Sequence, residues 1–64
     1  MSFAERLKNL RKERNMSIKE LSDVSGLSAV QISNYEHGHN VPNAINANRL
    51  AAALGCAYDE LMGR

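Results

Sequence analysis

Residues 28–36 carry side chains that could read the edges of nucleic-acid bases. Val30 and Asn34 stand four residues apart, so on a helix they share one face. A valine side chain can contact the C5-methyl group of thymine, and an asparagine amide can bond to N6 and N7 of adenine. The rest of this face is small or polar, whereas Ile32 and Tyr35, three residues apart, should face the core. We therefore expect contacts to DNA bases from Ser28, Ala29, Val30, Ser33 and Asn34.

Two other roles are open for this face from the sequence alone. Val30 could pack against a neighbouring helix or a partner, because a single apolar residue on an exposed face is ordinary. Asn34 could simply be hydrated.

The chain before this face predicts two short helices joined by a tight turn. Ser17 can cap a helix over residues 18–25, and Glu20 completes a capping box. Gly26 supplies the positive φ that a sharp corner needs, and Ser28 can cap the next helix. A helix–turn–helix of this kind presents its second helix to the major groove of DNA. The pattern therefore puts the candidate face on the reading helix.

Apolar spacing and capping residues predict three more helices. Phe3, Leu7 and Leu10 recur along the first one, and Asn43 can cap the fourth. We expect helices over residues 2–14, 18–25, 28–36, 44–54 and 58–62, with a loop over 37–42. Residues 1–64 thus form one small all-α domain. We expect Leu21 and Val24 on one side of the second helix, and Met16 and Cys56 in the core.

Several polar residues are placed where they could meet the DNA backbone. The start of the second helix offers free N–H groups, and the loop after the reading helix should lie along the phosphates. Lys19 could add a charge, although a hydrated side chain is the alternative. We expect phosphate contacts from Arg11, Ser17, Lys19, His37, His39, Asn40 and Asn43.

Arg11 and Glu36 are candidates for an ion pair between the first helix and the reading helix. Arg11 lies beside the apolar stripe of the first helix, and Glu36 ends the third. Removing one partner of a partly buried pair leaves the other charge without compensation. We therefore expect this pair to be structural.

Composition limits the other functions that the chain could have. The net charge is only +1, but residues 1–20 hold six basic and three acidic side chains, against two and four in residues 21–64. No stretch has the apolar length of a membrane span. His37 and His39 have no cysteine or carboxylate near them at the spacing of metal ligands. The sequence shows no pairing of a nucleophile with a base, so we do not expect an enzyme. We expect no metal, cofactor or small-molecule ligand, no membrane, and a cytoplasmic, nucleoid-associated protein of bacterial or phage origin.

The chain resembles the Cro/C1-type helix–turn–helix family, which includes phage repressors. The resemblance rests on LRKERNMS (10–17), on the pattern Leu21, Gly26, Leu27, Ser28 and Ile32, on YEHG (35–38), on Pro42 and on LAAALGCAYDELM (50–62). It implies a five-helix, lambda-repressor-like fold, dimeric operator binding and transcriptional control. It also implies an Arg11–Glu36 pair and a thymine contact at Val30. Two departures are Ile18, where many relatives have glutamine, and a loop after residue 36 without Lys or Arg.

These observations together predict a homodimeric, sequence-specific DNA-binding regulator, most simply a repressor of a palindromic operator. The expected partner is double-stranded DNA. We expect dimer contacts near the last helix, from Tyr58, Leu61 and Met62. The alternative is that these three side chains close the core, and for Leu61 we favour this alternative. The alternatives are a restriction–modification controller or antitoxin-type regulator on the same fold, and a protein-interaction module that does not bind DNA.

Overall fold

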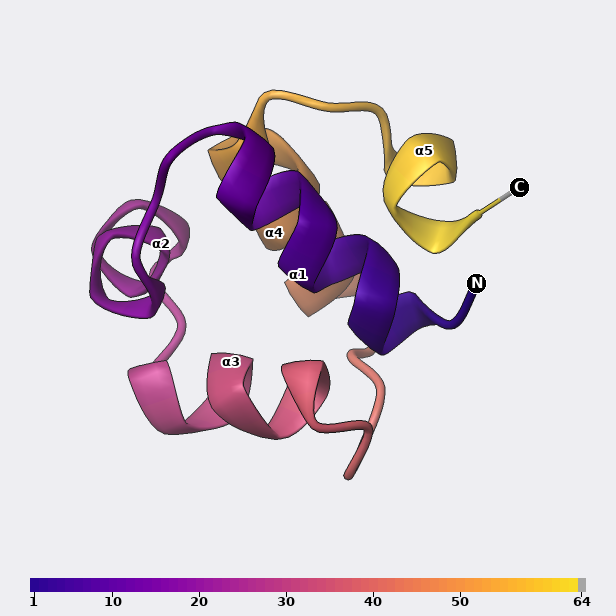
Figure 1. Cartoon of the computed structure of the whole chain (residues 1–64), viewed down its shortest axis with the longest axis horizontal. Helices are drawn as coiled ribbons and strands as arrows, with labels where there is room; N and C mark the ends of the chain where they lie inside the picture. Colours follow the sequence, from indigo (N-terminus) through magenta and orange to yellow (C-terminus); the bar gives the residue numbers. More distant parts are fainter. Residues whose placement is uncertain (64) are drawn as a thin grey trace.

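The structure, a computed structural model, describes residues 1–63 and contains five helices (Figure 1). In chain order they are α1 (Phe3–Glu13), α2 (Ile18–Ser25), α3 (Ala29–Glu36), α4 (Ala44–Leu54) and α5 (Tyr58–Met62). Residues 1–63 contain no β-strand. The predicted all-α class is confirmed, and each predicted helix end lies within one residue of the observed one.

Serine side chains begin the first three helices. Ser2, Ser17 and Ser28 each accept a hydrogen bond from the backbone N–H three residues later. The side chain of that later residue accepts in return from the backbone N–H of the serine. Each box therefore pairs N–H groups that the helix itself leaves without an acceptor. Asn43 caps α4 through its side chain, so the predicted caps of α2, α3 and α4 are confirmed.

The capping carboxylates make the stability of the fold depend on pH. The backbone N–H of Ser17 donates to the carboxylate of Glu20 at 2.9 Å. This bond lowers the pKa of Glu20 below its ordinary value of 4.5, and the same arrangement at Ser2 lowers the pKa of Glu5. A lowered folded-state pKa stabilises the fold above pH 4.5, and the contribution disappears as the pH falls through the lowered value.

We expect Glu20→Gln to weaken the dependence of the melting temperature on pH below about pH 5. Glutamine keeps an oxygen acceptor for the N–H of Ser17 but does not titrate. The measurement is the melting temperature by circular dichroism between pH 2 and 7, with Glu13→Gln as the control at an exposed glutamate outside any capping box. Equal pH profiles for wild type and Glu20→Gln would contradict the prediction.

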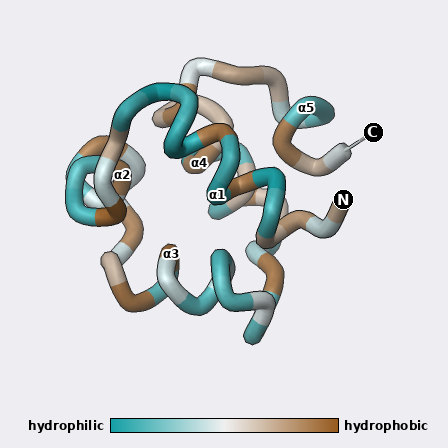
Figure 2. The backbone as a smooth tube through the Cα atoms, viewed as in Figure 1, coloured by the Kyte–Doolittle hydropathy of each residue, from teal (hydrophilic) through white to brown (hydrophobic). Residues whose placement is uncertain are grey.

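The core is assembled from one face of every helix. α1 packs against α3 and α5, α2 against α3 and α4, and α4 against α5. Hydrophobic bands recur along α1 between hydrophilic ones (Figure 2), and the ring of Phe3 meets that of Tyr35 edge to face at 6.3 Å. The core consists of Phe3, Leu7, Leu10, Leu21, Leu27, Ile32, Tyr35, Leu50, Ala51, Leu54 and Leu61.

The structure corrects the expected inner face of α2. Val24 is 62% exposed, and Ser25 is buried beside Leu21 instead. Ser25 can be buried because its hydroxyl accepts a hydrogen bond from the N–H of Leu27. Met16 and Cys56 are only half-buried, and both pack against the core from its edge.

Arginines of α1 bind the ends of other helices. Arg6 donates from Nε to the carbonyl oxygen of Leu61 at 3.1 Å and from Nη2 to that of Met62 at 3.0 Å. Arg14 donates from Nε to the carbonyl oxygen of Leu54 at 2.6 Å. Cations are favoured at helix C-termini, where carbonyl groups lack partners. These contacts hold α5 and α4 against α1, and Figure 1 shows α5 beside the N-terminal end of the chain.

Candidate functional site

The turn between α2 and α3 sets the position of the reading helix. Gly26 has φ of +78° and caps α2, its N–H donating to the carbonyl oxygen of Ser22. The hydroxyl of Ser22 in turn donates to the carbonyl oxygen of Leu27. A residue with a Cβ is strained at this φ. The turn thus fixes α3 at an angle to α2, along one edge of the molecule (Figure 1).

The two faces of α3 differ as the sequence predicts. Ile32 and Tyr35 are buried in the core. On the other side Val30 is 70% exposed, although it is a large apolar residue. Ser33 and Asn34 are half-buried beside it. The alternative in which Val30 is buried against a neighbouring helix is therefore wrong for residues 1–63, and its surface is open to DNA or to a partner.

Ser28 and Ala29, the other predicted base-contact residues, lie exposed at the start of α3. The hydroxyl of Ser28 accepts from the N–H of Gln31 at 3.1 Å as part of the helix cap. A serine hydroxyl that accepts one bond still has its hydrogen to donate. Both residues therefore remain open to a ligand that approaches the beginning of α3.

Gln31 is a further candidate that the sequence predictions omit. It is exposed on α3, and its Oε1 accepts from the N–H of Ser28 at 3.0 Å. The bond fixes the amide at the start of the helix and leaves its NH₂ group free to donate. The signal in the sequence is the Ser-x-x-Gln spacing of a capping box, which predicts an amide anchored at this place.

The predicted ion pair between α1 and α3 is confirmed. Arg11 donates from Nε to Oε2 of Glu36 at 2.7 Å and from Nη2 to Oε1 at 3.0 Å. Nη1 donates to the carbonyl oxygen of Met16 at 2.8 Å. The two side chains are only 12% and 5% exposed, and the bond to Glu36 raises the pKa of Arg11. The phosphate contact predicted for Arg11 would have to use the two N–H bonds that remain.

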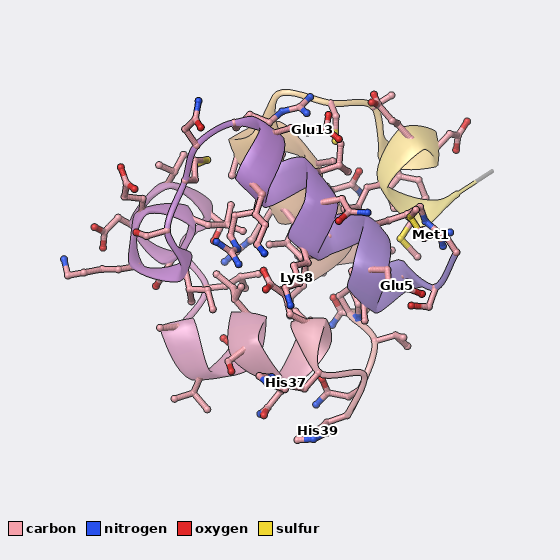
Figure 3. The ribbon with its side chains drawn as sticks, in the orientation of Figure 1. Met1, Glu5, Lys8, Glu13, His37 and His39 are labelled. Carbon is pink, nitrogen blue, oxygen red and sulfur yellow. The ribbon has the colours of Figure 1, made fainter. Side chains whose placement is uncertain are left out.

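The other residues predicted to contact phosphate lie at three places on the surface. Ser17 and Lys19 are exposed at the start of α2, where Nζ of Lys19 is 3.6 Å from Oδ2 of Asp23. His37 and His39 are exposed at the C-terminal end of α3, below the helix in Figure 3. Asn40 and Asn43 are exposed before α4, and Asn43 Oδ1 accepts from the N–H of Asn46.

The basic charge on α1 is smaller at the surface than the sequence suggests. Arg6, Arg11 and Arg14 all donate to acceptors within the protein. The exposed basic side chains of residues 1–20 are Lys8, Lys12 and Lys19. Any electrostatic attraction of an anion therefore depends on few charges.

One of the predicted dimer contacts is wrong. Leu61 is fully buried in the core, where α5 packs against α1 and α4 of the same chain, so the core position favoured for it is confirmed. Tyr58 and Met62 are half-buried and keep part of their surface exposed. These two residues remain the candidates on α5.

The acidic, histidine and cysteine side chains and the lengths of the helices bear on two other kinds of site in residues 1–63. No group of three or more His, Cys, Asp or Glu side chains there could hold a metal ion. No helix of this part of the chain is long and apolar enough to cross a membrane.

Comparison with known proteins gives consistent matches along the chain. The model of a family described as helix-turn-helix matches residues 7–61. The chain is 42% identical over 62 residues to the HTH-type transcriptional repressor RghR of Bacillus subtilis, covering 95% of this chain and 46% of that protein. It is 38% identical to the cryptic phage CTXphi transcriptional repressor RstR of Vibrio cholerae, covering 100% of this chain and 57% of the relative. The chain thus spans about half the length of these relatives.

Two solved structures resemble this chain over nearly their whole length. The restriction-modification controller protein C.AhdI from Aeromonas hydrophila superimposes with a TM-score of 0.92 at 31% identity, covering 95% of this chain and 92% of that one. The P22 c2 repressor, solved in complex with a synthetic operator, gives a TM-score of 0.90 at 32% identity, covering 97% and 94%.

Proposed function

The chain belongs to the helix-turn-helix family, and on that premise we propose that it binds double-stranded DNA sequence-specifically as a transcriptional repressor. The observation that carries the proposal is the outer face of α3. Val30 is 70% exposed there and stands beside the polar side chains of Ser33 and Asn34. An apolar group and an amide on one exposed helix face are suited to thymine methyl groups and adenine edges in the major groove.

The proposal assigns base contacts and backbone contacts to different residues. The base contacts come from Ser28, Ala29, Val30, Ser33 and Asn34, with Gln31 added. The backbone contacts come from Arg11, Ser17, Lys19, His37, His39, Asn40 and Asn43. The likeness to the P22 c2 repressor, solved in complex with a synthetic operator, supports double-stranded DNA as the partner. With DNA as the partner, the protein acts in the cytoplasm at the nucleoid.

A homodimer is the form in which we propose that the domain acts. A single eight-residue reading helix contacts few base pairs, and proteins with this motif pair two half-sites about 34–36 Å apart. Tyr58 and Met62 on α5 are the proposed contact residues, since they are apolar and only half-buried. The matching operator is an inverted repeat.

The test is a selection of duplex DNA from a random pool with the purified chain at near-physiological salt. An enriched inverted repeat supports sequence-specific dimeric binding. The absence of any enriched sequence contradicts the proposal and favours the protein-interaction module.

A controller of restriction–modification genes is a second candidate, which the likeness to C.AhdI supports. A search of the source genome for the selected sequence separates the two candidates, by whether that sequence lies beside restriction–modification genes or elsewhere.

We expect Lys19→Ala to weaken binding equally for all sequences and to reduce the salt slope of log K by about one unit. The side chain of Lys19 is 85% exposed, and its pairing with Asp23 at 3.6 Å is weak. The measurement is the binding constant between about 50 and 200 mM salt. Lys12→Ala, an exposed lysine on α1 outside the proposed surface, should leave the slope unchanged. Equal slopes for all three proteins would contradict the phosphate contact at Lys19.

A further inference from the structure

The C-terminal turn of α3 brings His39 back to Asn34. Gly38 has φ of +75°, and its N–H donates to the carbonyl oxygen of Tyr35 at 3.2 Å. The N–H of His39 then donates to the carbonyl oxygen of Asn34 at 3.0 Å. This pair of bonds is the closing motif of a helix that ends in a left-handed glycine. The backbone of His39 is therefore fixed against the last turn of the helix.

The side chains of the same two residues also meet. Nδ1 of His39 lies 3.4 Å from Oδ1 of Asn34. A carbonyl oxygen can only accept, so this bond forms in the tautomer of His39 that carries its hydrogen on Nδ1. His39 thus binds Asn34 through its backbone and through its ring.

His37 supports the ring of His39 from the side. Its own Nδ1 is 2.7 Å from the carbonyl oxygen of Ser33, which fixes the ring on the helix. The two ring centres are 5.8 Å apart and the planes are tilted by 34°, and Figure 3 shows the two histidines next to each other at the end of α3. The ring of His37 therefore lies next to the ring of His39 at the end of the helix.

We propose that His39 is a positioning residue that sets the orientation of the Asn34 amide and thereby its choice of base. The inference rests on the proposed function, in which Asn34 faces the major groove. Adenine offers an acceptor at N7 and a donor at N6, whereas guanine offers two acceptors. When His39 holds Oδ1 of Asn34, the amide keeps one lone pair on Oδ1 and both N–H bonds free. Its acceptor side and its donor side then cannot exchange places. This arrangement matches adenine. An amide that is free to rotate can also turn its NH₂ group to guanine.

For His39, this proposal replaces the phosphate contact that the sequence predicts and that the proposed function above includes. A phosphate contact strengthens binding to every sequence, and it adds to the salt slope when the imidazole is charged. A positioning role changes preference at one base pair and leaves the slope unchanged. The same variants therefore separate the two roles.

The experiment first identifies the base pair whose preference depends on Asn34, by comparing sites selected by the wild type and by Asn34→Ala. Affinities for all four versions of that base pair are then measured for wild type, His39→Ala, His39→Gln and His37→Ala. We expect His39→Ala to reduce the preference for adenine over guanine by about fivefold or more, since a bidentate pair discriminates by about 5- to 150-fold. Preferences at the other positions should not change. His39→Gln should restore part of the preference, because its amide can donate to Oδ1.

Each outcome decides between the proposals. If the wild type selects no site, both the proposed function and this inference are overturned. If Asn34→Ala loses the preference but His39→Ala keeps it, only the inference fails. An equal loss of affinity for all four base pairs, with a smaller salt slope, would assign His39 to phosphate instead. In the free protein, nitrogen-15 shifts of the neutral ring should place the hydrogen on Nδ1, and a hydrogen on Nε2 alone would also overturn the inference.

Discussion

Glu36→Ala is expected to lower the free energy of unfolding by about 3–5 kcal/mol. The change leaves the guanidinium of Arg11 without its counter-charge, in a place where its side chain is only 12% exposed. Arg11 cannot move into solvent freely, because Nη1 also donates to the carbonyl oxygen of Met16. In a domain of this size each kcal/mol lowers the melting temperature by about 4–8 °C. Urea and thermal unfolding followed by circular dichroism measure the loss.

A matched control is available on α1. Glu13 lies 3.6 Å from Nη1 of Arg14, but its side chain is 66% exposed. Exposed pairs contribute about 1 kcal/mol or less, so Glu13→Ala should be close to neutral. Comparable losses for Glu13→Ala and Glu36→Ala would show that burial does not decide the importance of the Arg11 pair. Glu36→Gln should fall between them, since it keeps an acceptor but removes the charge.

The pair also connects stability with the proposed reading surface. Glu36 is the last residue of α3, and Arg11 fixes it to α1. The next residues form the turn that carries His37 and His39. We therefore expect loss of the bridge to loosen the end of the reading helix before the rest of the domain unfolds.

Helix positions could be predicted from the sequence because the signals that determine them are local. Ser17, Ser28 and Asn43 each act on an N–H group three residues away, and Gly26 needs only its own φ. The burial of Ile32 and Tyr35 followed from their spacing. The Arg11–Glu36 pair was predictable as well, since Glu36 is the one charged residue of α3 and Arg11 lies beside the apolar stripe of α1.

Contacts between distant residues could not be predicted in this way. Arg6 and Arg14 look like hydrated charges in the sequence, but their acceptors are carbonyl groups 55 and 40 residues away. A carbonyl acceptor leaves no trace in residue types. The sequence leaves both a dimer contact and a core position open for Leu61 because α5 has five residues, too few for periodicity to show which apolar side chain points inward. The exposure of Val24 has a related cause. Ser25 is buried in its place because the N–H of Leu27 supplies a hydrogen bond to its hydroxyl.

Val30→Ala is expected to reduce the preference for thymine at one base pair by about 1–3 kcal/mol. The side chain of Val30 is 70% exposed, so its methyl groups are available to a ligand and contribute little to the core. The melting temperature should therefore change little. The measurement is the affinity for sites with thymine or another base at that pair, relative to the best selected site.

Two controls connect the effect to the methyl group itself. Val24→Ala makes the same chemical change at a valine of similar exposure on α2, 62% against 70%, and should leave every base preference unchanged. Replacing the thymine by uracil removes the C5-methyl group from the DNA. The wild type should then lose as much affinity as Val30→Ala loses on thymine, and Val30→Ala should not distinguish the two bases. If Val30→Ala still discriminates thymine from uracil, another side chain of α3 contacts the methyl group, and the face of the helix that enters the groove has to be reassigned.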